Sequence, residues 1–202
     1  MNNVGVILSG GAGLRMGGVR KADLRLGGTP LLARVFGRLA PQCDRVLFSI
    51  AREAAVSKAA ESLALETIED EPDGPPGPVA GLFAAIRWCA VNAPEARILT
   101  VAVDTPFFPS DFSTRANALL TDDVGGVIAA FGENRYPTNI LWRQEALEAT
   151  LSGASRDRRG PSLFSLAEAA GCVSLDYAPL ATANPFANVN ALPDLLALSR
   201  RS

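Results

Sequence analysis

The sequence predicts an α/β fold with a mainly parallel sheet, and three observations support this. Short apolar runs with β-branched residues recur along the first half of the chain. Segments with apolar residues at helical spacing separate these runs, and such alternation is typical of βαβ units. The run at 98–103 is almost entirely apolar, as expected of a central parallel strand. The length of 202 residues favours one domain, residues 1–202.

The predicted elements alternate from the N-terminus onward. Val4–Leu8 is a short apolar run that ends in glycines, which indicates a buried strand. Apolar residues at helical spacing predict a helix over Pro30–Ala40, and proline suits its first turn. The same patterns then predict strand Arg45–Ile50, helix Ala54–Leu63, strand Leu65–Ile68, helix Val79–Ala90, strand Ile98–Val103 and helix Ser110–Leu120.

The second half of the chain is less regular. Strands are predicted at Gly126–Phe131, Thr138–Trp142 and Val173–Asp176, and helices at Arg143–Leu151, Pro161–Ala170 and Pro193–Ser199. The first two strands flank a polar turn, which is compatible with an antiparallel pair. Gly153–Gly160 carries four charged residues and is expected to be a mobile loop.

Composition excludes several classes of protein. A formal net charge of −2 argues against a nucleic-acid binder, because the phosphate backbone calls for a basic surface. No segment approaches the roughly 20 apolar residues of a membrane span. The first apolar run is too short for a signal peptide. We therefore expect a cytoplasmic protein without a membrane or nucleic-acid partner.

Two residue types narrow the chemistry. Cys43, Cys89 and Cys172 form no CxxC pair, so we expect reduced, buried thiols. The chain contains no histidine, which excludes Ser-His-Asp and Cys-His catalysis and histidine-ligated metals. Catalysis is then left to carboxylates, lysine, arginine, backbone amides or a hard metal ion. That set suits phosphate chemistry, where positioning and charge neutralisation do most of the work.

A glycine-rich loop follows the first predicted strand. It runs from Leu8 through Ser9, Gly10 and Gly11 and continues to Lys21, with five glycines between positions 10 and 18. Glycines let successive backbone N–H groups approach an anion without side-chain interference, and Arg15 and Lys21 add two cations. The loop matches neither the P-loop pattern nor the dinucleotide-binding fingerprint. A flexible turn with solvated cations is the alternative, but the combination favours a phosphate site.

Asp104-Thr105-Pro106 directly follows the predicted central strand. Ligands of open α/β sheets bind at the carboxyl ends of the strands. A carboxylate at that edge is suited to hold Mg²⁺ beside a triphosphate. The alternative is an aspartate that starts a turn.

Two further segments leave alternatives open. In Glu69-Asp70-Glu71 the glutamates are expected to be solvated, whereas Asp70 could accept hydrogen bonds from a base or ribose. Asn188-Val189-Asn190 is either a simple turn or a segment that closes the site beside the metal.

Together these segments resemble a known family. Leu8–Gly18 with Lys21, Gly77-Pro-Val-Ala-Gly81, Asp104-Thr-Pro106 and Asn188-Val-Asn190 are similar to the motifs of the molybdenum cofactor guanylyltransferases. These enzymes are also known as the molybdopterin-guanine dinucleotide biosynthesis protein A family. The motifs occur in the family's order over nearly the whole chain.

The resemblance implies a fold and a reaction. The fold would be a Rossmann-like three-layer αβα sandwich of the nucleotide-diphospho-sugar transferase type. The reaction would transfer GMP from GTP to the terminal phosphate of molybdenum-bearing molybdopterin and release pyrophosphate. GTP and the molybdopterin cofactor would be the small-molecule partners, and molybdoenzymes or their chaperones would receive the product.

The resemblance also assigns residues. Lys21, Arg15 and Asp104 would be catalytic, and Asp104 and Asn190 would bind Mg²⁺. The nucleotide would contact Leu8, Ser9, Gly10, Gly11, Lys21, Ser49, Asp70, Gly81 and Asp104. An in-line attack on the α-phosphorus needs no general base, since the attacking group is already anionic.

Three departures from the family pattern concern substrate recognition. Ser49 stands where the family commonly has asparagine, Tyr136-Pro137-Thr138 where it often has His-Pro-Thr, and Gly153–Ser165 matches only in its basic character. Arg156, Arg158 and Arg159 in that segment would either bind the acceptor phosphate or face water. An enzyme that uses CTP or a sugar-phosphate acceptor is one alternative function, and a non-catalytic nucleotide-binding protein is another.

Overall fold

The computed structural model describes residues 2–9, 20–71, 77–153, 160–190 and 192–199. The strands are β1 (Asn3–Leu8), β2 (Arg25–Leu26), β3 (Thr29–Pro30), β4 (Arg45–Ile50), β5 (Glu66–Glu69), β6 (Arg97–Ala102), β7 (Gly126–Phe131), β8 (Asn134–Trp142) and β9 (Val173–Asp176). The α-helices are α1 (Leu31–Leu39), α2 (Lys58–Ser62), α3 (Pro78–Asn92), α4 (Phe112–Leu119), α5 (Gln144–Gly153), α6 (Leu163–Ala169) and α7 (Leu192–Ser199). Two 3₁₀ turns are η1 (Lys21–Asp23) and η2 (Ala40–Gln42).

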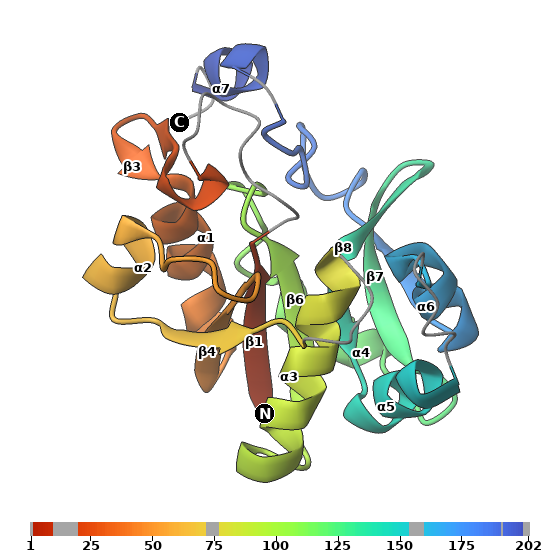
Figure 1. The fold of residues 1–202 in the computed structure, drawn as a ribbon. Coiled ribbons are helices and arrows are strands. Elements are labelled where there is room, and N and C mark those ends of the chain that lie inside the picture. The colour runs from red at the N-terminus through yellow and green to blue at the C-terminus, as the bar shows by residue number, and fades with distance from the viewer. Residues whose placement is uncertain (1, 10–19, 72–76, 154–159, 191, 200–202) are drawn as a thin grey trace.

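A seven-stranded sheet runs through the middle of the protein (Figure 1). Its strand order is β5-β4-β1-β6-β8-β7-β9. β8 is antiparallel to both of its neighbours, whereas the other six strands of this sheet share one direction. The predicted parallel sheet and the predicted antiparallel pair, β7 and β8, are both confirmed.

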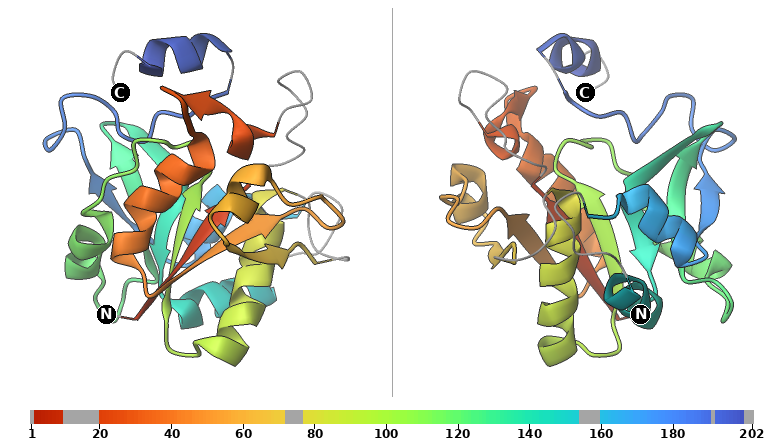
Figure 2. Two further views of the ribbon diagram at one scale, coloured as in Figure 1. Left: turned by 90° about the vertical axis from the view of Figure 1, so that its left-hand side faces the viewer. Right: turned by 45° about the vertical axis from the view of Figure 1, so that its right-hand side comes forward.

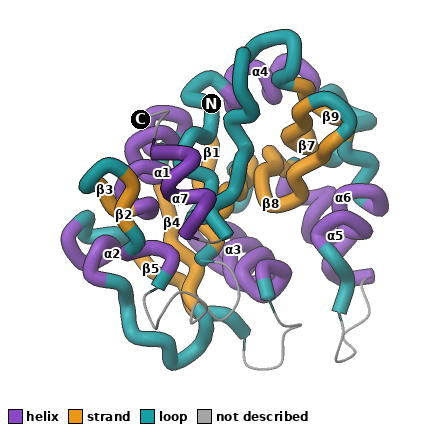
Figure 3. Tube along the Cα trace, turned by 90° about the horizontal axis from the view of Figure 1, so that it is seen from above, coloured by secondary structure: helices purple, strands orange, loops and turns teal. Residues whose placement is uncertain are grey.

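Helices cover both faces of this sheet, because successive strand residues point to opposite sides. In β1, Val4, Val6 and Leu8 pack in a core with residues of α3, α5 and α6. Ile7 packs on the other face, in a core with residues of α1, α2 and α4. Figure 3 shows α1 and α4 on one side of the strands and α3, α5 and α6 on the other. The three-layer αβα sandwich is therefore confirmed.

The C-terminal segment returns to the N-terminal part of the chain. Leu195 and Leu198 of α7 pack with Leu26 of β2, with Leu31 at the start of α1 and with Val189. In Figure 2, α7 lies above the strand ends, on the side of the molecule opposite the N-terminus. This small core brings Asn188 and Asn190 to the carboxyl ends of the parallel strands.

The structure corrects the prediction in two places. The helix predicted from Ala54 begins only at Lys58, because the Ser57 hydroxyl accepts a hydrogen bond from the Ala60 amide at 3.1 Å and caps it there. The β2–β3 hairpin was not predicted, although Gly27 and Gly28 both have positive φ, as a two-residue hairpin turn requires.

The structure also bears on the loop predicted at 153–160 and on membrane-spanning segments. Gly153 ends α5, so the predicted mobile loop does not include it. Positions 154–159 of that loop lie outside the described residues. Among the described helices, none combines the length and the apolar character needed to cross a membrane.

Candidate active site

The carboxyl ends of four parallel strands are joined by backbone hydrogen bonds. The Ser9 amide donates to the Ser49 carbonyl at 3.2 Å, and the Val103 amide donates to the Leu8 carbonyl at 3.0 Å. The Asp70 amide donates to the Ile50 carbonyl at 3.0 Å, which extends the row to the end of β5. Leu8, Ser9, Ser49, Asp70 and the start of the Asp104 turn therefore lie along one edge of the sheet, as the sequence predicted.

Lys21 and Asp104 form an ion pair at this edge. The lysine Nζ lies 2.6 Å from Asp104 Oδ2 and also donates to Asn190 Oδ1 at 3.2 Å. The Asp104 side chain is 11% exposed and that of Lys21 is 22% exposed. Asp104 and Asn190 lie 83 and 169 positions after Lys21 in the sequence, yet the three side chains meet at one point.

The backbone around Asp104 explains this meeting. The Val189 amide donates to the Asp104 carbonyl at 3.0 Å, and the Thr105 hydroxyl donates to Asn188 Oδ1 at 3.3 Å. The Asn190 amide in turn donates to Asp194 Oδ2 at 2.8 Å, at the start of α7. Asn188-Val189-Asn190 is therefore held against the Asp-Thr-Pro turn, which is more than a simple local turn.

One oxygen of Asp104 is available for a further partner. Asp104 Oδ1 is buried and accepts no hydrogen bond among the described residues. A buried carboxylate oxygen without a partner is costly, so such an atom is suited to contact a bound cation. Asp104 and the Asn190 carbonyl together offer the oxygen ligands that Mg²⁺ prefers.

Magnesium needs few ligands from the protein itself. Among the described residues, no cluster of three or more histidine, cysteine, aspartate or glutamate side chains could hold a metal by itself. Mg²⁺ commonly takes one or two carboxylates and completes its octahedron with substrate phosphates and water. The residues present therefore fit this ion at a site shared with a phosphate ligand.

Ser49 and Asp70 form a second polar pair on the same edge. The Ser49 hydroxyl donates to Asp70 Oδ1 at 3.2 Å. Burial raises the pKa of Asp70 above its ordinary value, and the hydrogen bond from Ser49 partly opposes this shift. A half-buried carboxylate that is raised in pKa and open on one side is suited to accept hydrogen bonds from a ligand.

Gly81 in the first turns of α3 permits this arrangement. A Cβ added at Gly81 would lie 2.5 Å from Ser49 Oγ and 2.8 Å from Leu8 Cδ2. The glycine therefore lets α3 pack directly on the ends of β1 and β4. Its contribution is close approach and not an unusual backbone angle, because no positive φ is found there.

The other residues that sequence analysis discussed are either not described or form contacts elsewhere. Gly10, Gly11 and Arg15 lie outside the described residues, as do Arg156, Arg158 and Arg159. Glu69 is exposed, and Glu71 pairs with Arg87 of α3. Glu69 thus agrees with the expectation of a solvated side chain, whereas Glu71 is 26% exposed and ion-paired, so for Glu71 that expectation is wrong.

Sequence analysis did not single out Asn139 or Asn184. Asn139 is fully buried in β8, and its Oδ1 accepts a hydrogen bond from the Ala102 amide at 3.4 Å, at the end of β6. Asn184 Nδ2 donates to the Tyr136 hydroxyl at 2.6 Å. Asparagine is depleted in strands, so its presence inside an apolar strand is the sequence signal that could have singled out Asn139.

Comparison with known proteins gives a family match. The model of the MobA-like NTP transferase domain matches residues 5–171. A molybdenum cofactor guanylyltransferase of Bradyrhizobium sp. (strain ORS 278) is 33% identical, over 97% of this chain and 91% of that protein. One from Cereibacter sphaeroides is 38% identical, over 70% of this chain and 69% of that protein.

Solved structures share the fold. The molybdopterin-guanine dinucleotide biosynthesis protein A of Archaeoglobus fulgidus superposes with a TM-score of 0.70 at 22% identity, over 98% of this chain and 97% of that one. A 4-diphosphocytidyl-2C-methyl-D-erythritol synthase does so with a TM-score of 0.70 at 13% identity, with the same coverage. The nucleotide-diphospho-sugar transferase type of fold is thus confirmed. From the family match and these relatives, the chain belongs to the MobA-like NTP transferase family, among the molybdenum cofactor guanylyltransferases.

Proposed function

We propose that this protein transfers GMP from GTP to the terminal phosphate of molybdenum-bearing molybdopterin and releases pyrophosphate. Its family supports a nucleotidyltransferase, and the relatives above are named for this guanylyl transfer. The observation that carries the proposal is the meeting of Lys21, Asp104 and Asn190 at the carboxyl edge of the sheet. This cluster joins the end of the glycine-rich segment to the end of the central strand.

In this proposal Mg²⁺ binds to Asp104 and to the side-chain carbonyl of Asn190. The unpartnered Oδ1 of Asp104 supports this assignment. Such an ion, when bound, neutralises charge on the phosphate oxygens and holds the triphosphate in place. In the structure the Lys21 ammonium contacts the side chains of both Asp104 and Asn190. It is therefore positioned to neutralise charge on the phosphate oxygens together with the metal.

The side chains have separate tasks. Lys21 neutralises charge on the oxygens of the leaving pyrophosphate, and Arg15 adds a second cation from the glycine loop. Leu8, Ser9, Gly10 and Gly11 begin the loop that binds the nucleotide. An acceptor phosphate oxygen forms the new bond to the α-phosphorus while the bond to the bridging oxygen of pyrophosphate breaks. No protein group has to remove a proton from the acceptor.

Base and ribose recognition is assigned to Ser49, Asp70 and Gly81. The Asp70 carboxylate accepts hydrogen bonds from the nucleoside, and Ser49 holds it in position. Gly81 keeps α3 close enough for a planar ligand to contact backbone atoms. A guanine offers N1–H and N2–H donors to such a carboxylate, whereas cytosine offers only its amino group.

Recognition of the pterin is assigned to Tyr136, because it stands where the family often has the histidine of His-Pro-Thr. Its ring packs on Phe186 with the centroids 5.2 Å apart, and its hydroxyl accepts from Asn184. The product would then pass to molybdoenzymes or to their chaperones.

Calorimetric titration with GTP, CTP and ATP, each with and without Mg²⁺, tests the nucleotide half of the proposal. We expect GTP to bind at least about tenfold more tightly than the others, a difference of about 1.4 kcal/mol, and only with the metal. A transfer assay with molybdopterin then measures pyrophosphate release. Preference for CTP would point to a cytidylyl relative, and nucleotide binding without pyrophosphate release would point to a non-catalytic nucleotide-binding protein. No binding at all would contradict the nucleotide site.

A further inference from the structure

A groove lies beside the candidate active site and has no part in the proposed reaction. It is a groove of about 820 Å³ between the segment 20–30, α1 and α2. Lys21 and Asp104 do not line it. The volume falls within the range of about 300–1,000 Å³ that is typical of small-molecule sites.

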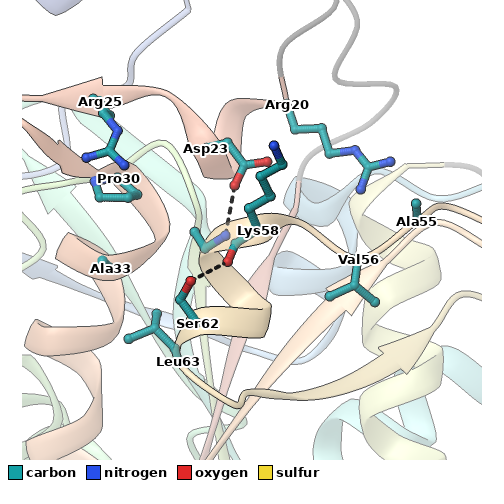
Figure 4. Close-up of a pocket in the computed structure, with 11 residues that line it drawn as sticks. Arg20, Asp23, Arg25, Pro30, Ala33, Ala55, Val56, Lys58, Ser62 and Leu63 are labelled. Carbon is teal, nitrogen blue, oxygen red and sulfur yellow. Dashed lines mark hydrogen bonds between the residues drawn. The ribbon is translucent and has the colours of Figure 1, made fainter.

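The groove has an apolar floor. Ala33 of α1, Ala55 and Val56 before α2, and Leu63 after α2 supply it, together with Pro30. In Figure 4, Ala33, Val56 and Leu63 lie below the charged side chains of Arg20, Arg25 and Lys58. An apolar floor favours a ligand with an apolar body.

Three cationic side chains surround this floor. Arg20 and Arg25 come from the segment 20–30, Lys58 comes from the start of α2, and all three line the groove. Figure 4 shows Lys58 between the two arginines, which stand at opposite ends. Within the part of the chain that the structure describes, neither Arg20 nor Lys58 has an ion-pair partner.

The one acidic side chain in the lining is already engaged. Asp23 Oδ1 accepts a hydrogen bond from the Ala59 amide at 2.9 Å and thereby holds α2 against η1. Three cations against one carboxylate leave the groove with a formal charge of +2, although the whole chain carries −2. The charge therefore favours an anionic occupant with more than one negative charge.

We propose that this groove binds a small organic phosphate, with its apolar body on the floor and its phosphate between Arg20, Lys58 and Arg25. Arginine suits phosphate because its fork of N–H donors can bind two oxygens at once, and lysine adds a point charge. Arg25 uses one nitrogen on the Gly28 carbonyl at 2.5 Å, which positions the guanidinium and leaves its other donors for the ligand.

Binding here would restrain the segment that carries Lys21. Arg20 precedes Lys21 directly, and Lys21 reaches Asp104 on the other side of this segment. A ligand that bridges Arg20 and Lys58 would tie this segment to α2, in addition to the bond between Asp23 and Ala59.

The two lysines of the chain make a direct test possible. Lys21 and Lys58 are the only lysines in the sequence, one at the candidate active site and one in the groove. The probe is pyridoxal 5′-phosphate, which has a phosphate, an apolar ring and an aldehyde. Its aldehyde condenses with the lysine amine to an imine and releases water. Borohydride then adds a hydride to the imine carbon and water supplies the proton to nitrogen, so mass spectrometry can count the label at each lysine.

We expect saturable labelling of Lys58, with pyridoxal 5′-phosphate at least about tenfold more effective than pyridoxal, which lacks the phosphate. The double variant Arg20→Gln/Arg25→Gln should lose that preference while Lys21 is labelled as before. Arg45→Gln is the matched control, because Arg45 is an exposed arginine that pairs with Glu66 away from the groove. It should leave the labelling of Lys58 unchanged.

Two results would overturn the proposal. Equal labelling of Lys58 by both aldehydes would mean that the groove does not recognise the phosphate. Protection of Lys58 by the same Mg²⁺–GTP concentration that protects Lys21 would make the groove part of the nucleotide site. The labelling requires no turnover, so its outcome does not depend on the proposed guanylyl transfer.

Discussion

The ammonium nitrogen of Lys21 lies 2.6 Å from Oδ2 of Asp104, so the segment after the glycine loop is joined to the end of the central strand. Both side chains are mostly shielded from solvent, which makes the attraction between them stronger than that of a surface pair. The same contact places two of the three residues that the resemblance assigns to catalysis side by side. It therefore links the stability of the fold to the proposed chemistry.

Lys21→Ala should lower kcat for guanylyl transfer by about 10²–10³, because the lost charge is felt most in the transition state. It should also lower the free energy of unfolding by about 1–2 kcal/mol, since Asp104 is left without its partner. Steady-state kinetics and urea unfolding measure the two effects. Lys58→Ala is the control, because that lysine lies away from Asp104. An unchanged kcat would make Lys21 a structural cation only.

Asp104→Asn should abolish Mg²⁺-dependent turnover while the fold stays intact. The amide keeps the shape of the side chain, and the Val189 amide still binds the backbone carbonyl. In the double variant Lys21→Ala/Asp104→Asn, unfolding should require more urea than in Lys21→Ala alone, because no unpaired carboxylate remains. Full activity of Asp104→Asn would remove this residue from the mechanism.

Ser49→Ala should raise the pKa of Asp70 further, because the hydrogen bond that opposes the effect of burial is lost. NMR titration of the Asp70 carboxyl group measures this directly. The pKa of Asp70 is higher in the folded protein than in the unfolded chain. The contribution of Asp70 to the free energy of unfolding is therefore fully present at acidic pH and is lost as the pH rises through the folded pKa. Asp70→Asn should therefore lose less stability than the wild type between acidic and neutral pH. A lower Asp70 pKa in Ser49→Ala would contradict this account.

Gly81→Ala should reduce the free energy of unfolding by about 1–3 kcal/mol, because the new methyl group would overlap Ser49 and Leu8. It should also weaken GTP binding, since Ser49 and Asp70 would be displaced. Gly37→Ala is the matched control in α1. Nothing lies within 4 Å of its added Cβ, so that variant should gain about 0.5–1 kcal/mol from helix propensity. Equal stability of the two variants would contradict the close approach at Gly81.

The thiols of Cys43, Cys89 and Cys172 should react slowly in the folded protein. All three are free, and Cys89 is buried as expected, whereas Cys43 and Cys172 are only half-buried. Burial raises the pKa of each thiol to about 12. At pH 8 their reaction with a disulfide reagent should be about a hundredfold slower than after denaturation, because the thiolate is the reactive form. Rapid reaction of any one thiol in the native protein would show that it is not protected.

Much of the fold follows from local sequence patterns. The boundaries of β4, β7 and β9 match the predictions, because apolar β-branched runs between turn residues specify strands locally. The start of α2 was missed because alanines at Ala54 and Ala55 favour helix, whereas the Ser57 cap sets the first turn. The β2–β3 hairpin was missed because each strand has only two residues, although Gly27-Gly28 is a known hairpin signal.

The sequence by itself determined most of the strands and helices and their succession along the chain. It also determined the absence of histidine chemistry and the residue types that suit a phosphate and a hard metal ion. Only the tertiary structure decided that Asn190 reaches Lys21 and that Asp104 keeps one buried oxygen without a partner. It also decided that Arg20, Arg25 and Lys58 share one groove. The physical reason is that strand and helix patterns arise from neighbours along the chain, whereas these contacts depend on how distant segments pack.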